Sequence, residues 1–364
     1  MRIAMIGDGE SPHLLKWARA LAAATDVELW VASSRGFAIG FDGVVPASRR
    51  LALKTRPARR GGNARVLAQL PRLAAWLRRV DADWLHAHYL TSHGTLAWLA
   101  KRLFGLRARI VGSAWGSDIL IAPRRSTAVR WLTRSVLRAC TLTTSDSAYM
   151  AEQMRELGAR EVMTFPFGLE RMPAHPSMKD PFLFFANRGL EALYRPEHVL
   201  QLFAAVAAVQ PAARLAVAND GSLSGTLPAT ATGIGLRVGR FEDGAQVEFF
   251  GRLDAATQDH WYARSQWYLS LPSSDSVAVS VLEAMAHGCI PVLSDLPANR
   301  ELVRTGETGL IVAEQAYDPL PILALAPRAA YIAQENRSWV AQHGLFAPAV
   351  ERFIARLCAI PDTP

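Results

Sequence analysis

Two carboxylates stand eight residues apart at the start of an apolar helical pattern. Asp275 lies in a loop of small residues, and Glu283 lies about one turn inside the helix expected over residues 279–286. The backbone amides near Val279 and Ser280 fall at the amino end of that helix, where the helix dipole favours negative charge. This arrangement predicts an anion site suited to a diphosphate.

Glu283 stands among apolar neighbours such as Val281, Leu282 and Met285. A carboxylate in apolar surroundings is costly unless it accepts hydrogen bonds. The vicinal hydroxyls of a ribose would supply such bonds, so an anion site beside this carboxylate indicates a nucleotide. The alternative is an ordinary surface helix in which Glu283 faces water.

Histidines gather along and after the strand expected over residues 84–88. His86 and His88 alternate along that strand and therefore share a face, as two metal ligands would. Because no acidic residue or cysteine nearby completes a ligand set, we expect no metal. A glycine loop, Gly7-Asp8-Gly9, follows the first expected strand, but Pro12 stands where a dinucleotide-binding fingerprint needs its third glycine.

Strands and helices that alternate along the chain must position these residues. The alternation runs twice, before and after a segment without periodicity at residues 169–177, which predicts two parallel-sheet α/β domains and a linker. We expect domains over residues 1–170 and 178–344. Helical spacing covers residues 339–359, and a C-terminal helix of about 345–364 is expected to return to the first domain. Ligands should bind in a cleft between the carboxyl ends of the two sheets.

Single elements follow from the period of the apolar residues. The stretch 221–243 is rich in glycine and threonine, and its structure is not predicted. Strands are expected over 2–6, 27–32, 84–88, 108–112, 141–144, 182–186, 214–218, 246–250, 267–271 and 290–294. Helices are expected over 14–22, 64–79, 94–103, 128–138, 198–209, 256–264 and 279–286.

Composition bounds the class of protein. The chain has 364 residues, half of them hydrophobic and a fifth charged, which suits two globular domains and excludes a disordered or collagen-like chain. Its three cysteines, Cys140, Cys289 and Cys358, are far apart in the sequence, so we expect neither a disulfide framework nor a zinc cage. We therefore expect the protein in a reducing cytoplasm. The N-terminal apolar run is too short for a signal peptide, and no stretch is long enough to span a membrane.

Positive charge is concentrated in the first half of the chain. The net charge is +8, yet residues 1–171 hold 26 basic and 13 acidic side chains, whereas the remainder holds 14 basic and 19 acidic ones. This excess of positive charge favours an anionic partner: nucleic acid, an anionic membrane or a phosphorylated substrate. The alternative is that the charges form only a solvated surface. Ten basic residues and no acidic one lie between residues 43 and 80: Arg49, Arg50, Lys54, Arg56, Arg59, Arg60, Arg65, Arg72, Arg78 and Arg79.

The stretch from Asp275 to Val292 resembles the signature of the family-four retaining glycosyltransferases, whose GT-B fold has two Rossmann-like domains facing each other. The family pattern is E-x7-E followed by A-M-A-x-G-x-P-V, and the chain matches it from Glu283 onward, with Asp275 in place of the first glutamate. The resemblance implies that Glu283 holds the ribose and that Asp275 holds hydroxyls of the donor sugar. The shorter acid therefore bears on sugar specificity.

A second match, over residues 185–196, implies a clamp on the donor diphosphate. In the family a Gly-Arg loop and a lysine contact the diphosphate, and here Arg188 and Arg195 stand at similar spacing. Two guanidiniums can stabilise the charge of a leaving nucleoside diphosphate without a metal. The further donor-binding candidates that the resemblance implies are Gly9, Asn187, Gly251, Arg252, Ser276, Val279 and Ser280.

The first domain is implied to bind the acceptor. Residues 112–118 resemble a family segment T-x-H-G-x-D, in which Asp118 matches and Trp115 replaces the histidine that touches the donor sugar. Trp115 either leaves that contact to another residue or forms an aromatic platform for a sugar face. His13, His88, Trp115 and Asp118 are the acceptor and cleft candidates.

These observations predict a cytoplasmic retaining glycosyltransferase. It would move a sugar from a nucleotide-diphosphate sugar to a glycan or lipid-linked acceptor in cell-envelope polysaccharide or lipopolysaccharide synthesis. We nominate Asp275, Glu283, Arg188 and Arg195 as catalytic residues and expect no cofactor, no metal and no nucleic-acid partner. The basic run predicts peripheral attachment to the anionic inner face of a membrane. The alternatives are a sugar-nucleotide epimerase of GT-B fold, a non-catalytic glycosyltransferase relative and a basic nucleic-acid-binding protein.

Overall fold

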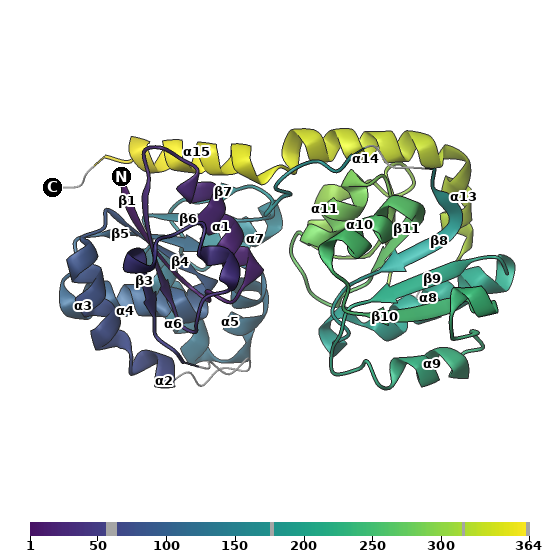
Figure 1. Ribbon diagram of the computed structural model, residues 1–364, viewed down its shortest axis with the longest axis horizontal. Coiled ribbons are helices and arrows are strands. Elements are labelled where there is room, and N and C mark those ends of the chain that lie inside the picture. Colours follow the sequence, from purple (N-terminus) through teal and green to yellow (C-terminus); the bar gives the residue numbers. More distant parts are fainter. Residues whose placement is uncertain (56–63, 175–177, 315–316, 362–364) are drawn as a thin grey trace. The chain divides into compact units, whose positions relative to one another are not determined.

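The chain forms two compact units, each built around one parallel sheet (Figure 1). The computed structural model describes residues 1–55, 64–174, 178–314 and 317–361. Unit 1 combines Met1–Phe165 with the C-terminal segment from Phe346, and unit 2 is Pro166–Leu345. Three arginines of the basic run (Arg56, Arg59 and Arg60) and part of the expected linker (175–177) lie outside the described residues.

Unit 1 contains a seven-stranded parallel sheet with the order β3-β2-β1-β4-β5-β6-β7. Nearly all side chains of the central strands β1 and β4 are buried, as expected for strands covered by helices on both faces. The edge strands β3 and β7 have three residues each, too few for a period in the sequence to predict them. The strands are β1 (Arg2–Gly7), β2 (Glu28–Ser33), β3 (Arg50–Ala52), β4 (Trp84–His88), β5 (Arg109–Ser113), β6 (Leu142–Ser145) and β7 (Val162–Thr164).

The helix expected over residues 64–79 is wrong as one element, because the structure has two helices there. The first ends at Leu67 and the second begins at Leu70, with Pro71 in its first turn. Proline has no backbone N–H and is tolerated at a helix start but not inside a helix, so Pro71 forces a new beginning. The helices of unit 1 are α1 (Pro12–Ala22), α2 (Ala64–Leu67), α3 (Leu70–Val80), α4 (Thr95–Phe104), α5 (Ala122–Arg125), α6 (Thr127–Ala139), α7 (Ala148–Glu156) and α15 (Phe346–Ala359).

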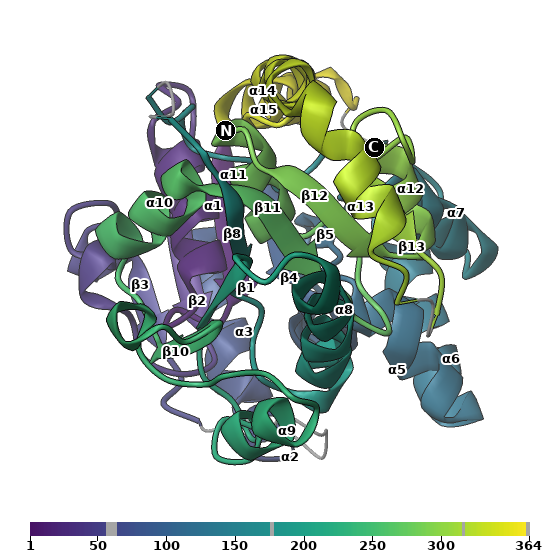
Figure 2. The same ribbon diagram turned by 90° about the vertical axis from the view of Figure 1, so that its right-hand side faces the viewer.

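Unit 2 contains a six-stranded parallel sheet with the order β10-β9-β8-β11-β12-β13. Phe184 and Phe185 are neighbours on the central strand β8 and point to opposite faces, each into its own apolar core. Figure 2, which faces unit 2, shows α8 and α11 on opposite sides of this sheet. The strands are β8 (Asp180–Ala186), β9 (Arg214–Ala218), β10 (Val247–Gly251), β11 (Ser265–Ser270), β12 (Ile290–Ser294) and β13 (Leu310–Val312).

The helices of unit 2 connect its strands, and three of them agree closely with the sequence predictions. The stretch 221–243, for which the sequence predicts no structure, contains the short helix α9. The two parallel-sheet α/β domains predicted from the alternation are confirmed. The helices are α8 (Pro196–Val209), α9 (Leu227–Gly233), α10 (Ala255–Arg264), α11 (Val279–Ala286), α12 (Pro297–Leu302), α13 (Leu320–Leu325) and α14 (Ala329–His343).

The helical segment expected over residues 339–359 consists of two helices, because α14 ends at His343 and α15 begins at Phe346. Between them the carbonyl oxygen of Gly344 accepts a hydrogen bond of 2.7 Å from the Leu169 amide. A Cβ atom at Gly168 would lie 1.9 Å from that same oxygen, so this crossing requires glycine. The close approach of the two backbones explains the break.

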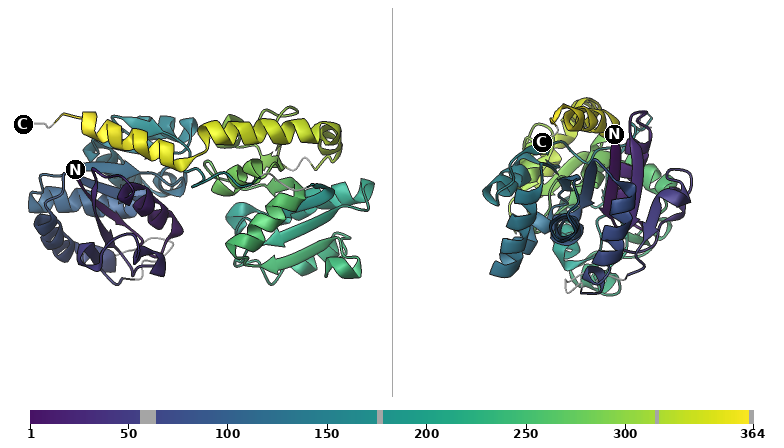
Figure 3. Two further views of the ribbon diagram at one scale, coloured as in Figure 1. Left: turned by 45° about the horizontal axis from the view of Figure 1, so that its top comes forward. Right: turned by 90° about the vertical axis from the view of Figure 1, so that its left-hand side faces the viewer.

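The helix α15 belongs to unit 1 and packs against α1 (Figure 3). Trp17 of α1 meets Phe346 and Phe353 of α15 edge to face, with ring centroids 5.0 and 5.2 Å apart. Arg356 of α15 also pairs with Glu161 at 2.6 Å. The last helix therefore completes the core of unit 1. Over the described ranges, none of the helices is both long and apolar enough to cross a bilayer.

Candidate functional site

The segment that carries the two predicted carboxylates is a strand, a loop and a helix of unit 2. Strand β11 ends at Ser270, the loop carries Asp275, and α11 begins at Val279. The residue before α11 is Ala278, whose side chain has no oxygen to cap the first turn of the helix. The amino end of α11 therefore keeps the positive end of its dipole available to an anion.

Arg188 lies directly after β8 and reaches this loop. Its Nη2 atom donates to Oδ2 of Asp275 at 2.5 Å, and its Nη1 atom donates to the Ser280 hydroxyl at 3.1 Å. Its guanidinium also stacks on the ring of Tyr194, 4.5 Å from the centroid. The structure thus brings together three predicted site residues, Arg188, Asp275 and Ser280, at the amino end of α11.

Asp275 and Arg188 are mostly buried, with side chains 22% and 17% exposed. Burial raises the pKa of Asp275 above its ordinary value, although the guanidinium and the backbone amide of Ser276 both oppose this rise. The Ser276 amide donates to Oδ1 of Asp275 at 3.0 Å. The Nε atom of Arg188 is buried and has no hydrogen-bond partner among the residues that the structure describes. A strong donor in such a place is suited to an incoming anion.

Glu283 is placed by a tyrosine that the sequence reasoning missed. The hydroxyl of Tyr262, on α10, donates to Oε2 of Glu283 at 3.0 Å and accepts from the side-chain amide of Asn187 at 2.8 Å. The Tyr268 hydroxyl donates to Oδ1 of the Asn187 side chain at 2.8 Å. Burial raises the pKa of Tyr262 well above its ordinary value, so its hydroxyl keeps the proton that it donates.

This network joins the end of β8 to α11 through one buried hydroxyl. Neither Tyr262 nor Tyr268 belongs to a motif, and both look like core residues in the sequence because a tyrosine ring is mostly apolar. Tyr262 lies in the helix expected over residues 256–264 and Tyr268 in the strand expected over 267–271. These positions gave no sign of a site. Their hydroxyls are visible as site residues only once the fold is known.

Arg195 supports the loop from the other side. Its Nε and Nη2 atoms donate to the carbonyl oxygens of Leu271 and Pro272, both at 2.9 Å, and its Nη1 atom pairs with Glu314 at 2.8 Å. Its backbone has a φ of +46°, a left-handed conformation that costs energy in a residue with a side chain. The structure therefore places Arg195 on the backbone of the Asp275 loop.

The other donor-binding candidates of unit 2 lie along the same sheet edge. Gly251 ends β10 with a φ of +64°, which favours glycine, and its carbonyl oxygen accepts from the Asn219 amide at 2.6 Å. Arg252 follows it and is exposed. Beside Arg188 a mostly apolar pocket opens between the strand ends and α8, lined by residues that include Ala186, Val217 and Phe249.

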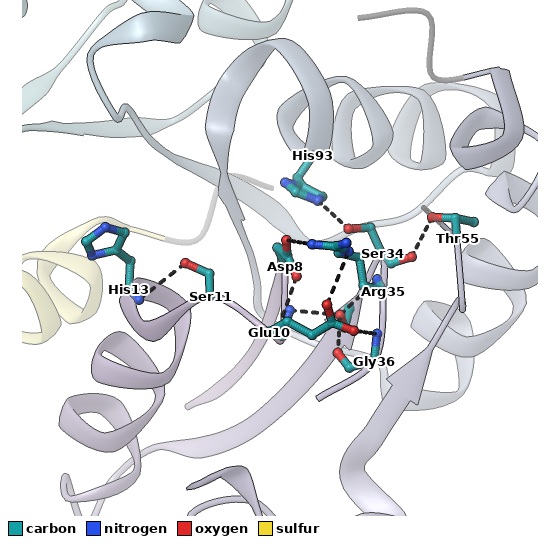
Figure 4. Close-up of polar contacts among 11 residues, drawn as sticks. Asp8, Glu10, Ser11, His13, Ser34, Arg35, Gly36, Thr55 and His93 are labelled. Carbon is teal, nitrogen blue, oxygen red and sulfur yellow. Dashed lines mark hydrogen bonds and ion pairs between the residues drawn. The ribbon is translucent and has the colours of Figure 1, made fainter. Parts of the chain in front are cut away.

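The glycine loop of unit 1 is fixed by its own chain. The Gly9 amide donates to the Ser33 hydroxyl at 2.8 Å, and a Cβ atom at Gly9 would lie 2.5 Å from the carbonyl oxygen of Gly36. Figure 4 shows the polar contacts around this loop, in which Arg35 lies 3.5 Å from Asp8 and 3.3 Å from Glu10. Glycine is required here for close backbone approach, and its amide is already used within unit 1.

The three histidines along and after β4 are buried, and burial lowers the pKa of each below its ordinary value. His86 shares a hydrogen bond of 2.7 Å with the Ser113 hydroxyl, and burial lowers its pKa to about 3. Burial lowers the pKa of His88 still more clearly, and neither of its ring nitrogens has a hydrogen-bond partner among the described residues. His93 shares a hydrogen bond of 2.7 Å with the His88 carbonyl oxygen and one of 3.0 Å with the Ser34 hydroxyl, the latter drawn in Figure 4. Across the described ranges, no three His, Cys, Asp or Glu side chains are grouped as metal ligands.

Three rings lie together at the carboxyl end of the unit 1 sheet. Trp115 stacks on Tyr89 with ring centroids 5.8 Å apart and lies 4.8 Å from the ring of His13. The buried Asp118 carboxylate accepts hydrogen bonds of 2.8 Å from the amides of both Leu90 and Trp115. Asp118 thus holds the two loops that carry the stacked rings. Sequence reasoning missed Tyr89, which has a φ of +63° and directly follows β4.

Two family models match consecutive parts of the chain. Residues 2–147 match the family described as "Glycosyl transferase 4-like", and residues 170–320 match "Glycosyl transferases group 1". The chain is 24% identical over 258 residues to N-acetyl-alpha-D-glucosaminyl L-malate synthase of Bacillus anthracis. That match covers 67% of this chain and 65% of the Bacillus enzyme, so the similarity spans about two thirds of that relative's length.

Solved structures share the fold over the whole chain. HepE of Anabaena, determined with UDP, is 14% identical, with a TM-score of 0.77 over 99% of this chain and 100% of that one. The same protein with UDP-glucose gives 15% identity and a TM-score of 0.76. Sucrose-phosphate synthase of Thermosynechococcus elongatus is 15% identical, with a TM-score of 0.75 and 99% of each chain covered. At these identities the likeness establishes the GT-B fold.

Proposed function

Since the chain belongs to the glycosyltransferases, with the GT-B fold and a family-four type of sequence, we propose that it transfers a sugar from a nucleotide-diphosphate sugar with retention at the anomeric carbon. The observation that carries the proposal is the cluster of Arg188, Asp275 and Ser280 at the amino end of α11. Two similar structures hold UDP or UDP-glucose, which agrees with a nucleotide-sugar donor.

Arg188 and the first turn of α11 would bind the donor diphosphate. During transfer the bond between the anomeric carbon and the phosphate oxygen breaks, and the bond to the acceptor oxygen forms on the same face of the sugar. The leaving phosphate oxygen receives the acceptor's proton. Negative charge grows on the diphosphate as this happens, so a guanidinium and a helix amino end that are already in place stabilise the transition state more than the ground state.

Asp275 and Glu283 would hold hydroxyl groups of the donor. Asp275 now accepts from Arg188, and a diphosphate that draws the guanidinium toward itself leaves this carboxylate for the sugar hydroxyls. Glu283, which accepts a hydrogen bond from the Tyr262 hydroxyl, would also accept hydrogen bonds from the ribose hydroxyls. Arg195 acts through the backbone of the Asp275 loop, which makes it a positioning residue in this proposal.

Unit 1 would bind the acceptor, a glycan or a lipid-linked glycan of the cell envelope. The stacked rings of Trp115, Tyr89 and His13 support this assignment, because the apolar faces of sugars lie well on aromatic rings. The excess of positive charge in this half of the chain supports an acceptor or a membrane with negative charge. We place the enzyme in the cytoplasm, at the inner face of the membrane.

A transfer assay with a panel of UDP, GDP, ADP and TDP sugars tests the proposal. We expect release of one nucleoside diphosphate that depends on acceptor and is unchanged by EDTA, because arginines supply the positive charge. Proton NMR of the product gives the anomeric configuration, and inversion would contradict the proposal. Turnover of the donor without any acceptor would favour an epimerase, and binding of a nucleotide sugar without turnover would favour a non-catalytic relative.

A further inference from the structure

Two large apolar side chains on helices α6 and α4 of unit 1 are exposed to solvent. Trp131 of α6 and Leu103 of α4 have 64% and 63% of their surface exposed, unusually high fractions for large apolar side chains. Trp131 meets Trp98 of α4 edge to face, with ring centroids 6.2 Å apart. The indole is thus held outward by a neighbouring ring, so the apolar group is preformed.

Exposed arginines without an acidic partner among the described residues lie on α6 beside Trp131 in the sequence and on the neighbouring helix α5. Between Asp118 and Asp146 the chain has no acidic residue and five arginines. Arg124 and Arg125 of α5 and Arg130 of α6 are exposed, and within the described ranges none of the three forms an ion pair. Helices α5 and α6 pack against each other (Figure 2).

The basic run at residues 43–80 is only partly matched by acidic partners. Arg49 lies 3.4 Å from Glu28 and over the Trp30 ring, and Arg50 pairs with Asp42 at 2.8 Å. Arg65, Arg72 and Arg79 of this run are exposed and form no ion pair within the described ranges. The arginines of α5 and α6 differ from these because they accompany an exposed tryptophan, Trp131.

We propose that unit 1 docks on an anionic lipid bilayer through the Trp131 face, defined as Arg124, Arg125, Arg130 and Trp131. Trp131 enters the boundary between headgroups and acyl chains, where tryptophan is favoured, and the arginines bind the lipid phosphates. The inference rests on the proposed function, because it names the surface that brings the enzyme to a membrane-linked acceptor.

A bilayer fits this face better than other anionic partners. Trp131 is 64% exposed and is therefore accessible for insertion between lipid headgroups. Each arginine near an anionic surface strengthens binding roughly fivefold, and several arginines near an inserted indole give attachment that depends on salt. Stacking of RNA bases on Trp131 is the competing use of the same face.

Co-sedimentation of the full chain with vesicles tests the proposal. We expect binding to vesicles of phosphatidylcholine with phosphatidylglycerol, weak binding to pure phosphatidylcholine, and loss of binding in high salt. The triple variant Arg124→Glu, Arg125→Glu, Arg130→Glu should bind at least about a hundredfold more weakly. Trp131→Ser, at an exposed position, should fold normally and bind roughly tenfold more weakly.

The matched control is Arg65→Glu, Arg72→Glu, Arg79→Glu, which makes the same charge change at exposed arginines of the basic run. The proposal is overturned if this control loses as much binding as the first triple variant. Tighter binding of the Trp131 face to a single-stranded RNA than to the vesicles would also overturn it.

Nucleotide-sugar binding, measured without vesicles, separates this inference from the proposed function. Binding of a donor by both triple variants, without vesicle binding by the wild type, contradicts only the docking surface. Failure of the wild type to bind any nucleotide sugar contradicts the proposed function, whatever the vesicles show.

Discussion

At the end of β4 in unit 1 the polar side chains are neutral and enclosed, whereas at the end of β8 in unit 2 they are charged and reach toward an open helix end. His86 and His88 lie among the rings of Trp17 and Phe353, and burial keeps both imidazoles neutral. Arg188 pairs with Asp275 beside an uncapped helix. Both strands lie in the middle of their sheets, so the chemistry of the residues at the end of each strand distinguishes core from site.

The largest expected effect tests whether the end of β4 is core. Trp17→Ala removes a ring that is 2% exposed and contacts His86, His88, Phe346 and Phe353, so unit 1 should lose about 3–5 kcal/mol of unfolding free energy. Urea unfolding followed by circular dichroism measures it. Trp131→Ala is the control, because an exposed tryptophan should change the free energy by about 0.5 kcal/mol or less. Equal losses in the two variants would contradict the comparison.

The next effect tests whether the end of β8 is the site. Arg188→Ala removes the guanidinium proposed to meet the diphosphate, so kcat/KM should fall roughly a hundredfold to a thousandfold with little change in unit 1. The matched control is Arg214→Ala, which breaks another arginine–aspartate pair, with Asp180 at 2.6 Å, at the amino ends of β9 and β8. Comparable losses of kcat/KM in both variants would argue for a structural role of Arg188.

Tyr262→Phe sharpens the comparison inside unit 2. It removes one hydroxyl that donates to Glu283 and leaves the ring in place, so nucleotide Kd should rise roughly tenfold to hundredfold, as for a lost hydrogen bond to a charged group. Calorimetric titration with the preferred nucleotide measures this. Tyr331→Phe, on the exposed side of α14, should leave Kd unchanged. A rise in Kd with both variants would show that the effect does not come from Glu283.

The smallest effect concerns the ion pair that fastens α15 to unit 1. The hydrogen bond from Arg356 lowers the pKa of Glu161, so this pair stabilises the folded state above the ordinary glutamate pKa and loses its effect as pH falls through the lowered pKa. Both side chains are about two fifths exposed, so Glu161→Gln should cost less than about 1 kcal/mol at pH 7. Denaturation at several pH values tests the sign: a difference between wild type and variant that grows in acid would contradict it.

Local patterns predicted the central strands and most long helices because these elements have their own apolar period, whereas α7 and most of α14 were not predicted. The bounds of α11 and β12 are those predicted, since small residues before the helix and Gly288 after it mark its ends in the sequence. Local patterns failed to predict where some helices begin and end. Pro71 divides a helical pattern, and the break at Gly344 depends on a backbone bond to Leu169, which no local pattern contains.

The candidate site was predictable where a motif contains it. The two carboxylates and Arg188 belong to patterns in the sequence, whereas Tyr262, Tyr268 and Tyr89 act through single polar groups on otherwise apolar rings. The charge of residues 43–80 shows the converse. A count of arginines does not reveal that Arg49 and Arg50 already have acidic partners in the fold.

Calorimetric titration of UDP and the other nucleoside diphosphates tests the central claim most directly, namely that the donor diphosphate binds at the end of β8. Wild type, Arg188→Ala, Glu283→Ala and Trp115→Ala would be compared without metal. We predict that one nucleotide binds the wild type and Trp115→Ala alike, and binds the two unit 2 variants at least about tenfold more weakly. Unchanged binding in Arg188→Ala and Glu283→Ala, with binding lost in Trp115→Ala, would contradict the account.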